Sequence, residues 1–222
     1  MTIAGPSPKA KVNMLRPAAW YQYQRGLTYV SSAVSVWADQ TANARHLLQA
    51  TGSARPVQQT DGSILCDGSA TFLQTATFTL VQPTTVYALF RQVTFTNTGV
   101  LLDGFTVTSG QFLQDTTTPN ISLSSGTTAG TNTSFTLNTY CVGVAVFSGA
   151  NSTLVRNKAV IPAVANVGTT AMAGLTVGAN GGTPSAFGNA QFKEIIVFPV
   201  AHTPTQQLQV INYLSMVGGL GL

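Results

Sequence analysis

Charged side chains are scarce in this sequence of 222 residues, where they make up 7% of the total, against about 25% in an ordinary globular protein. The surface must therefore be covered mainly by Thr, Ser, Asn, Gln and Gly. Charge normally keeps the exposed strand edges of neighbouring molecules apart, so a surface of this kind favours association. The composition predicts a protein that works in an assembly, in contact with itself or with partner proteins.

Glutamate occurs once, as Glu194, and the five aspartates are scattered along the chain. A glycosidase built on a β-sandwich needs two carboxylates that flank the scissile bond. On a strand, such a pair would lie two residues apart, yet the residues at these distances from Glu194 are Phe192 and Ile196. We therefore expect Glu194 to be structural, and we expect no catalytic residues and no enzyme activity.

Histidine and cysteine are also sparse, with two of each. Neither histidine lies near a Gly-x-Ser-x-Gly motif of a nucleophilic hydrolase, and the four residues lack the spacing of a metal site. Calcium would need several oxygen ligands, for which Asp39 and Asp67 are the remaining candidates. Both are more simply explained as turn-stabilising carboxylates. The sequence predicts no metal and no cofactor.

Long apolar runs are absent too. No stretch approaches the roughly 18 apolar residues that cross a membrane, and the first 25 residues lack the apolar centre of a signal peptide. We expect no membrane contact and folding in a cytoplasm. Cys66 and Cys141 lie in apolar strand patterns, which predicts buried thiols that the cytoplasm keeps reduced. A single disulfide between them is the alternative.

The basic residues are concentrated near the N-terminus, and the net charge is +4. Residues 1–15 contain three Gly or Pro positions and no strand periodicity, so they are predicted to form an extended arm. Lys9, Lys11 and Arg16 are candidates for docking this arm on an acidic partner surface. A flexible, solvated terminus is the alternative. Nucleic-acid binding is disfavoured because the arm has no dense basic run.

Residues 16–222 show short strand patterns with turns every eight to twelve residues, which is typical of a single β-sandwich domain. The longest predicted strand, 85–95, is expected to pair with residues 99–107 across a turn at Asn97-Thr98-Gly99. The segment Asp67-Gly68-Ser69 predicts a tight turn. Trp37 is expected in the core.

One helix is predicted, near the C-terminus. Residues 192–198 form a strand pattern ended by Pro199, and Thr203, Pro204 and Gln206 then supply a capping box with proline at the first helical position. Leu208, Ile211, Leu214 and Val217 recur at helical spacing. Gly218 suits the left-handed residue that ends a helix.

Trp20, Tyr21 and Tyr23, interleaved with Gln22 and Gln24, offer the aromatic faces and amides that bind sugars. Strand alternation, however, would place Tyr21 and Tyr23 on one face and Trp20 on the other. Part of this set must therefore belong to the core. The three aromatic residues are candidates for a glycan-binding site.

Several motifs, in order over about residues 16–218, resemble the concanavalin A-like, laminin-G-like jelly-roll domains common in phage virion proteins. They are Val36-Trp37-Ala38-Asp39-Gln40, Arg55-Pro56, Cys66-Asp67-Gly68 before Phe72-Leu73, Gln82-Pro83-Thr84-Thr85-Val86-Tyr87, Phe147-Ser148-Gly149-Ala150-Asn151-Ser152, Leu175-Thr176-Val177-Gly178, and Lys193-Glu194-Ile195-Ile196-Val197 with the helix after it. The resemblance implies an all-β fold, with two antiparallel sheets in a jelly-roll sandwich. It also places Glu194 where this family buries a carboxylate.

Members of that family bind sugars, cleave glycans or serve only as virion structure, so the fold cannot choose the function. The low charge and missing catalytic pair favour a non-enzymatic phage virion protein on the particle surface, either a capsid decoration, a head fibre or a tail fibre component. It would be assembled in the host cytoplasm, with other virion proteins as partners. The alternative is a carbohydrate-binding adhesin module that recognises a host surface glycan.

Overall fold

The computed structural model describes residues 5–115, 117–132, 135–161 and 166–222. In these ranges the chain is mostly β structure, and every pairing between its strands is antiparallel. The strands are β1 (Ala19–Tyr21), β2 (Leu27–Val30), β3 (Ala33–Trp37), β4 (Leu47–Leu48), β5 (Val57–Gln58), β6 (Ile64–Asp67), β7 (Leu73–Gln74), β8 (Thr84–Gln92), β9 (Val100–Asp103), β10 (Ser109–Gln114), β11 (Ile121–Ser125), β12 (Thr128–Asn132), β13 (Cys141–Phe147), β14 (Thr153–Arg156), β15 (Ala159–Ile161), β16 (Thr176–Val177) and β17 (Asn189–Phe198). The helices are α1 (Pro8–Met14) and α2 (Pro204–Gly218).

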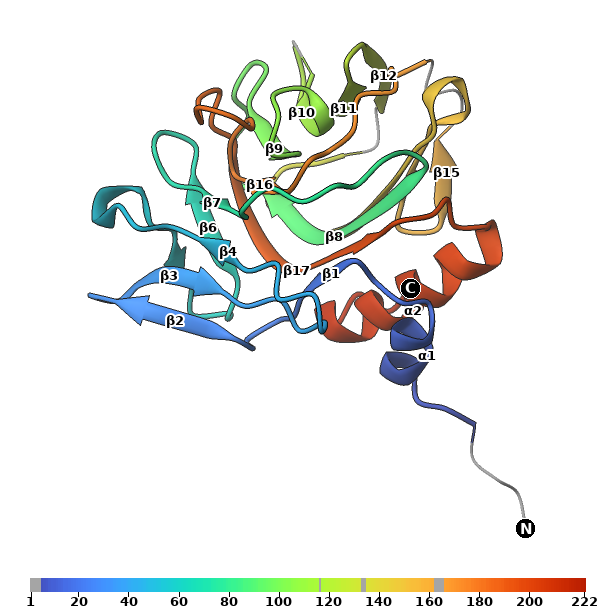
Figure 1. Ribbon diagram of the computed structural model, residues 1–222, viewed down its shortest axis with the longest axis horizontal. Helices are drawn as coiled ribbons and strands as arrows, with labels where there is room; N and C mark the ends of the chain where they lie inside the picture. Colours follow the sequence, from blue (N-terminus) through green and yellow to red (C-terminus); the bar gives the residue numbers. More distant parts are fainter. Residues whose placement is uncertain (1–4, 116, 133–134, 162–165) are drawn as a thin grey trace.

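Hydrogen bonds join these strands into one continuous path. It runs through β15, β14, β13, β8 and β17, turns through β6, β5, β3, β4 and β7, and returns through β16, β9, β10, β11 and β12. The two-residue strands β4, β5 and β7 let the sheet bend sharply in the middle of this path. The result is an antiparallel sheet curved nearly into a barrel (Figure 1). The predicted β architecture is confirmed at this level.

The main core lies inside the curved sheet. Phe90 on β8 and Phe112 on β10 face each other across it, with ring centroids 6.4 Å apart, and Phe112 also lies 6.5 Å from Phe147 on β13. Trp37 is buried in the same cluster, as predicted, together with Cys66 and Cys141, which are unpaired. This core joins strands from both ends of the strand path.

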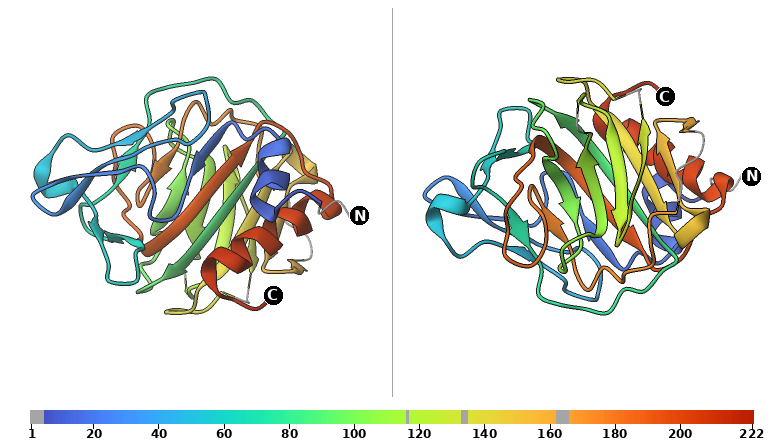
Figure 2. Two further views of the ribbon diagram at one scale, coloured as in Figure 1. Left: turned by 90° about the horizontal axis from the view of Figure 1, so that it is seen from below. Right: turned by 90° about the horizontal axis from the view of Figure 1, so that it is seen from above.

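A second core covers the outer face of the sheet, where α1 and α2 lie across β17 and β8 (Figure 2). Because β8 packs on the main core with one face and on the helices with the other, nearly all of its residues are buried. This explains why the sequence of β8 lacks a polar face. None of the helices within the described residues is long and apolar enough to cross a membrane.

Helix α2 begins as predicted, with Thr203 and Gln206 in a capping box and Pro204 at the first position. Its left-handed cap is Gly219, one residue later than predicted. The buried face also differs, since Val210 and Tyr213 are buried while Leu208 is 44% exposed. The hydrophobic pattern of α2 is weak. Contacts with the neighbouring strands therefore help to determine which face of the helix is buried.

The prediction of an extended N-terminal arm is wrong for residues 8–14, which form α1. Ser7 caps this helix by accepting a hydrogen bond from the amide of Ala10, and Pro8 occupies its first turn. Val12 is completely buried in the second core. Proline at a helix start is favourable, so a feature taken as a sign of extended chain here begins a helix.

The hairpin predicted between residues 85–95 and 99–107 is not formed. Strand β8 pairs with β13 and β17, while β9 pairs with β10 and β16. The chain after β8 crosses to the opposite side of the core, because both edges of β8 are already taken by longer partners. Antiparallel hairpins instead join β13 to β14 and β14 to β15.

Candidate functional site

Acidic side chains in this fold hold turns together. The Asp39 carboxylate accepts hydrogen bonds from the amides of Trp20, Thr41 and Arg45 and from the Thr41 hydroxyl, at distances of 2.8–3.0 Å. Asp67 accepts from the amides of residues 69, 70 and 71. In these contacts, both carboxylates accept from amides of the turns beside them.

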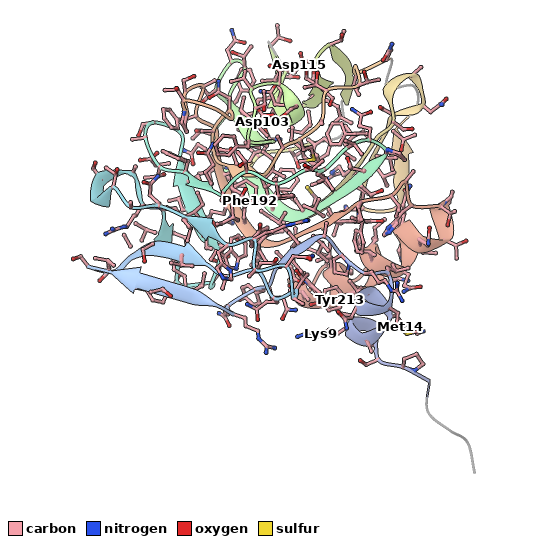
Figure 3. The ribbon with its side chains drawn as sticks, viewed as in Figure 1. Lys9, Met14, Asp103, Asp115, Phe192 and Tyr213 are labelled. Atoms are coloured by element: carbon pink, nitrogen blue, oxygen red, sulfur yellow. The ribbon has the colours of Figure 1, made fainter. Side chains whose placement is uncertain are left out.

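Asp103 is fully buried and serves the same purpose on β9. Its two oxygens accept from the amides of Gly104, Thr108, Ser109 and Gly181 and from the Gln111 side chain. Figure 3 shows Asp103 and Asp115 on the other side of the molecule from Lys9. Asp103 therefore fastens two loops and has no oxygen left for a ligand.

Glu194 lies on the outer face of β17 and is 1% exposed. Its Oε1 accepts from the indole nitrogen of Trp20 at 2.6 Å, and its Oε2 accepts from the Tyr23 amide at 3.2 Å. The pKa of this carboxyl is raised, because the effect of burial outweighs that of the hydrogen bonds from Trp20, Tyr213 and the Tyr23 amide, which lower it. An indole and a backbone amide are therefore the partners of this buried carboxyl. The structural role predicted for Glu194 agrees with this geometry.

A second polar cluster follows Glu194 along the outer face. A β-bulge in β17 at residues 192–194 turns Lys193 outward, where its Nζ lies 4.2 Å from the Tyr140 ring centroid and 5.4 Å from that of Tyr23. The Tyr140 hydroxyl donates to Oδ2 of Asp61 at 2.6 Å, and the Tyr23 hydroxyl donates to the backbone oxygen of Asp61 at the same distance. Burial raises the pKa of Asp61, but hydrogen bonds from Ser63 and Tyr140 bring it down to about 2. The cluster is therefore internally satisfied, and a cation already lies over both rings.

A cavity of about 370 Å³ opens beside α1 and is the strongest candidate for a binding site. We call it the N-terminal pocket. Its lining residues are Ser7, Lys9, Ala10, Asn13, Trp20, Gln22, Arg25 and Gln40.

Local structure brings these residues together from three segments. On α1, Lys9 and Asn13 lie four residues apart and so share a helix face, while Val12 points into the core. The backbone oxygen of Trp20, on β1, accepts a hydrogen bond from the Gln40 backbone amide at 2.8 Å. The Arg25 backbone amide donates to the Gln22 backbone oxygen at 3.2 Å. This hydrogen bond closes a turn that places Arg25 beside Gln22.

The pocket is polar and positively charged. The ammonium of Lys9 donates to Oε1 of Gln22 at 2.8 Å and lies 5.8 Å from the Trp20 ring centroid. Nε2 of the Gln40 side chain donates a hydrogen bond to the Ala38 backbone oxygen at 2.9 Å. None of the lining residues is acidic, and the nearby Glu194 is covered by Trp20 and bonded to its indole.

The structure separates the residues predicted as functional. Trp20 and Tyr21 are 2% and 0% exposed, so the predicted open sugar-binding face is wrong for these two residues. Both rings are needed in the cores, where Tyr21 packs at 5.8 Å from Trp37 and Trp20 at 5.6 Å from Tyr213.

Of the predicted docking residues, Lys9 enters the N-terminal pocket while Lys11 and Arg16 are exposed elsewhere. The sequence reasoning missed Asn13, Arg25 and Gln40 as pocket residues. The only signal for Arg25 was its position as a basic residue in an aromatic, amide-rich stretch. For Gln40, on a loop beyond β3, no local pattern would have indicated it.

Among the described residues, no three His, Cys, Asp or Glu side chains gather as metal ligands would. His46 accepts from the Asp39 amide through Nδ1 at 3.1 Å. His202 is buried beside Tyr87, with its Nδ1 and the tyrosine hydroxyl 2.7 Å apart. Both histidines therefore have structural surroundings.

No family model and no curated protein matches the sequence. Solved structures do match the fold. A Trypanosoma rangeli sialidase in complex with sialic acid aligns over 94% of this chain with a TM-score of 0.62 at 10% identity. An arabinofuranosidase complexed with arabinofuranosyl-α-1,2-xylobiose aligns over 82% of this chain, with a TM-score of 0.62 at 11% identity.

Domain 4 of an extracellular arabinanase from Geobacillus stearothermophilus, in complex with arabinotriose, aligns over 88% of this chain with a TM-score of 0.60 at 11% identity. This chain spans 98% of that domain, but only 37% of the sialidase and 50% of the arabinofuranosidase. At these identities the likeness establishes a shared antiparallel β fold. It corresponds to a domain-sized part of larger carbohydrate-active proteins.

Proposed function

We propose that the chain is a non-enzymatic surface component of a phage virion, either a capsid decoration, a head fibre or a tail fibre, with a concanavalin A-like jelly-roll topology. The observation that carries the non-enzymatic part is the use of the acidic side chains. Five of the six acidic residues accept hydrogen bonds that close turns or fasten strands. A general acid or nucleophile needs a carboxylate that faces a substrate.

Contact with other particle proteins is supported by the surface. The helical layer exposes Met14 at 71%, Leu208 at 44% and Met216 at 67%. These apolar side chains lie on a molecule with few charges to oppose association. The helices lie on the outer face of the sheet and would provide the contact surface.

The test of this function is the composition of the particle. Virions purified from a lysate of the cells in which the gene is expressed should contain the chain, by mass spectrometry, and gold-labelled antibodies should mark the head or the tail. Absence of the chain from purified particles would overturn the proposal. The purified chain should also leave arabinan and sialyl-oligosaccharides unhydrolysed.

A second candidate function is a carbohydrate-binding module. It is favoured by the N-terminal pocket, whose three carboxamides can each donate and accept hydrogen bonds to sugar hydroxyls. The arabinanase domain and the sialidase were solved with arabinotriose and sialic acid bound. A glycan array probed with the purified chain tests this function directly, and binding that a pocket variant such as Gln40→Ala abolishes would support it.

A further inference from the structure

We propose that the N-terminal pocket selects glycans that carry a carboxylate, and that Lys9 and Arg25 hold this group. The inference rests on the second candidate function and assigns it a ligand class. Neutral glycans would then enter the pocket weakly.

The charge of the pocket favours an anionic ligand. Lys9 and Arg25 supply two positive charges, and no lining residue supplies a negative one. The Lys9 ammonium donates to the neutral amide oxygen of Gln22, and its charge also acts on the buried Glu194 carboxyl behind Trp20. Within the described ranges, the salt bridge that the structure contains joins Lys193 and Asp61, outside this pocket. A carboxylate ligand would replace a neutral acceptor with a charged one, which forms stronger hydrogen bonds.

The uncharged groups of the pocket favour a sugar. Asn13, Gln22 and Gln40 surround the cations and offer both donors and acceptors. A simple inorganic anion has no use for acceptors, whereas sugar hydroxyls both donate and accept. The combination of cations and carboxamides therefore fits an acidic sugar better than a bare anion.

The size and surroundings of the pocket favour a short ligand. A volume of about 370 Å³ lies near the lower end of the range of roughly 300–1,000 Å³ for small-molecule sites. A peptide that binds by adding a strand to the sheet would instead require free backbone groups at a strand edge. Here the backbone oxygen of Trp20 already accepts from the Gln40 amide, and β1 is paired with β17 on its other side. The pocket thus suits a short, hydroxylated ligand.

The pocket is also held in place before any ligand binds. The Trp20 amide donates to Asp39 and its indole donates to Glu194, which fixes the back wall. Gly26 has a positive φ of 70°, and a Cβ there would lie 2.5 Å from Nε2 of Gln40. Glycine at this position therefore leaves room for the Gln40 side chain.

The experiment compares acidic and neutral oligosaccharides by titration calorimetry. The acidic probes are α-1,4-trigalacturonate and 3′-sialyllactose, and their neutral counterparts are α-1,4-galactotriose and lactose. The protein forms are the wild type, Lys9→Gln/Arg25→Gln, and the control Lys11→Gln/Arg16→Gln, which loses the same net charge from exposed positions outside the pocket. Thermal melting of each form confirms that it is folded.

We expect the wild type and the control to bind at least one acidic probe, with added salt weakening the binding. The pocket variant should bind that probe at least about tenfold more weakly, because it loses charge-assisted hydrogen bonds. Equal binding of neutral and acidic probes would overturn the acid preference while leaving glycan binding intact. Failure of every acidic probe, equal weakening in the control, or a preference for hexaglutamate over the sugars would also overturn the proposal.

Discussion

The indole nitrogen of Trp20 lies 2.6 Å from Oε1 of Glu194, and this hydrogen bond links positions 174 residues apart. Tyr213 on α2 packs edge-on against the same indole, with centroids 5.6 Å apart. The contact therefore connects β1, β17 and the C-terminal helix at one point. It also forms the back wall of the N-terminal pocket.

Replacing Glu194 with Gln should lower stability, because the new amide group would face an indole or backbone N–H that needs an acceptor. The expected loss is about 1–3 kcal/mol in urea unfolding. Trp20→Phe removes the N–H donor and keeps an aromatic ring. The double variant should therefore lose less stability than the sum of the losses in the two single variants. Strictly additive losses would show that the hydrogen bond contributes nothing. No glycan hydrolysis should depend on Glu194.

Acidification should destabilise the protein through His202. Burial lowers the pKa of this imidazole to about 4, from an unfolded value of about 6.5. The unfolded chain therefore takes up the proton first, and stability falls by up to about 1.4 kcal/mol per pH unit as the pH drops from 6.5 to 4. Unfolding in urea at several pH values measures this slope.

The variant His202→Gln removes this titrating group and should flatten the slope over the same range. The wild type, unfolded in the same pH series, is the reference. If His202→Gln keeps the full slope, His202 is not its source.

Helix α1 should contribute to the fold. Val12→Ala removes two buried methyl groups from the second core, and it should cost about 2 kcal/mol. Lys11→Ala, one residue away and exposed, should change stability by less than about 0.5 kcal/mol. Deleting residues 2–13 should lower the melting temperature clearly. A deletion that melts like the wild type would show that α1 is a docking arm without a structural role.

The two thiols should be unreactive in the native protein. Burial raises the pKa of Cys66 well above its ordinary value and that of Cys141 to about 12, so almost no thiolate forms at neutral pH. Iodoacetamide should modify neither residue under native conditions and both in guanidinium chloride, as mass spectrometry would show. A mass two hydrogens lower in the non-reduced protein would reveal a disulfide instead.

Local sequence determined the features whose partners lie a few residues apart. The start of α2 follows from Thr203, Pro204 and Gln206, because a capping box joins residues three positions apart. The Asp67 turn and the all-β character follow from similarly short-range preferences. Short-range rules also misled, since Pro8 begins a helix and does not continue an extended arm.

Tertiary structure decided what depends on contacts between distant segments. The partners of β8 are β13 and β17, because these two long strands occupy both of its edges, and no turn signal encodes that choice. Trp20 is buried because Glu194 and Tyr213 come to it from the far end of the chain. The N-terminal pocket exists for the same reason: its cations and amides come from α1, the turn after β1 and a loop beyond β3, and only folding places them around one cavity.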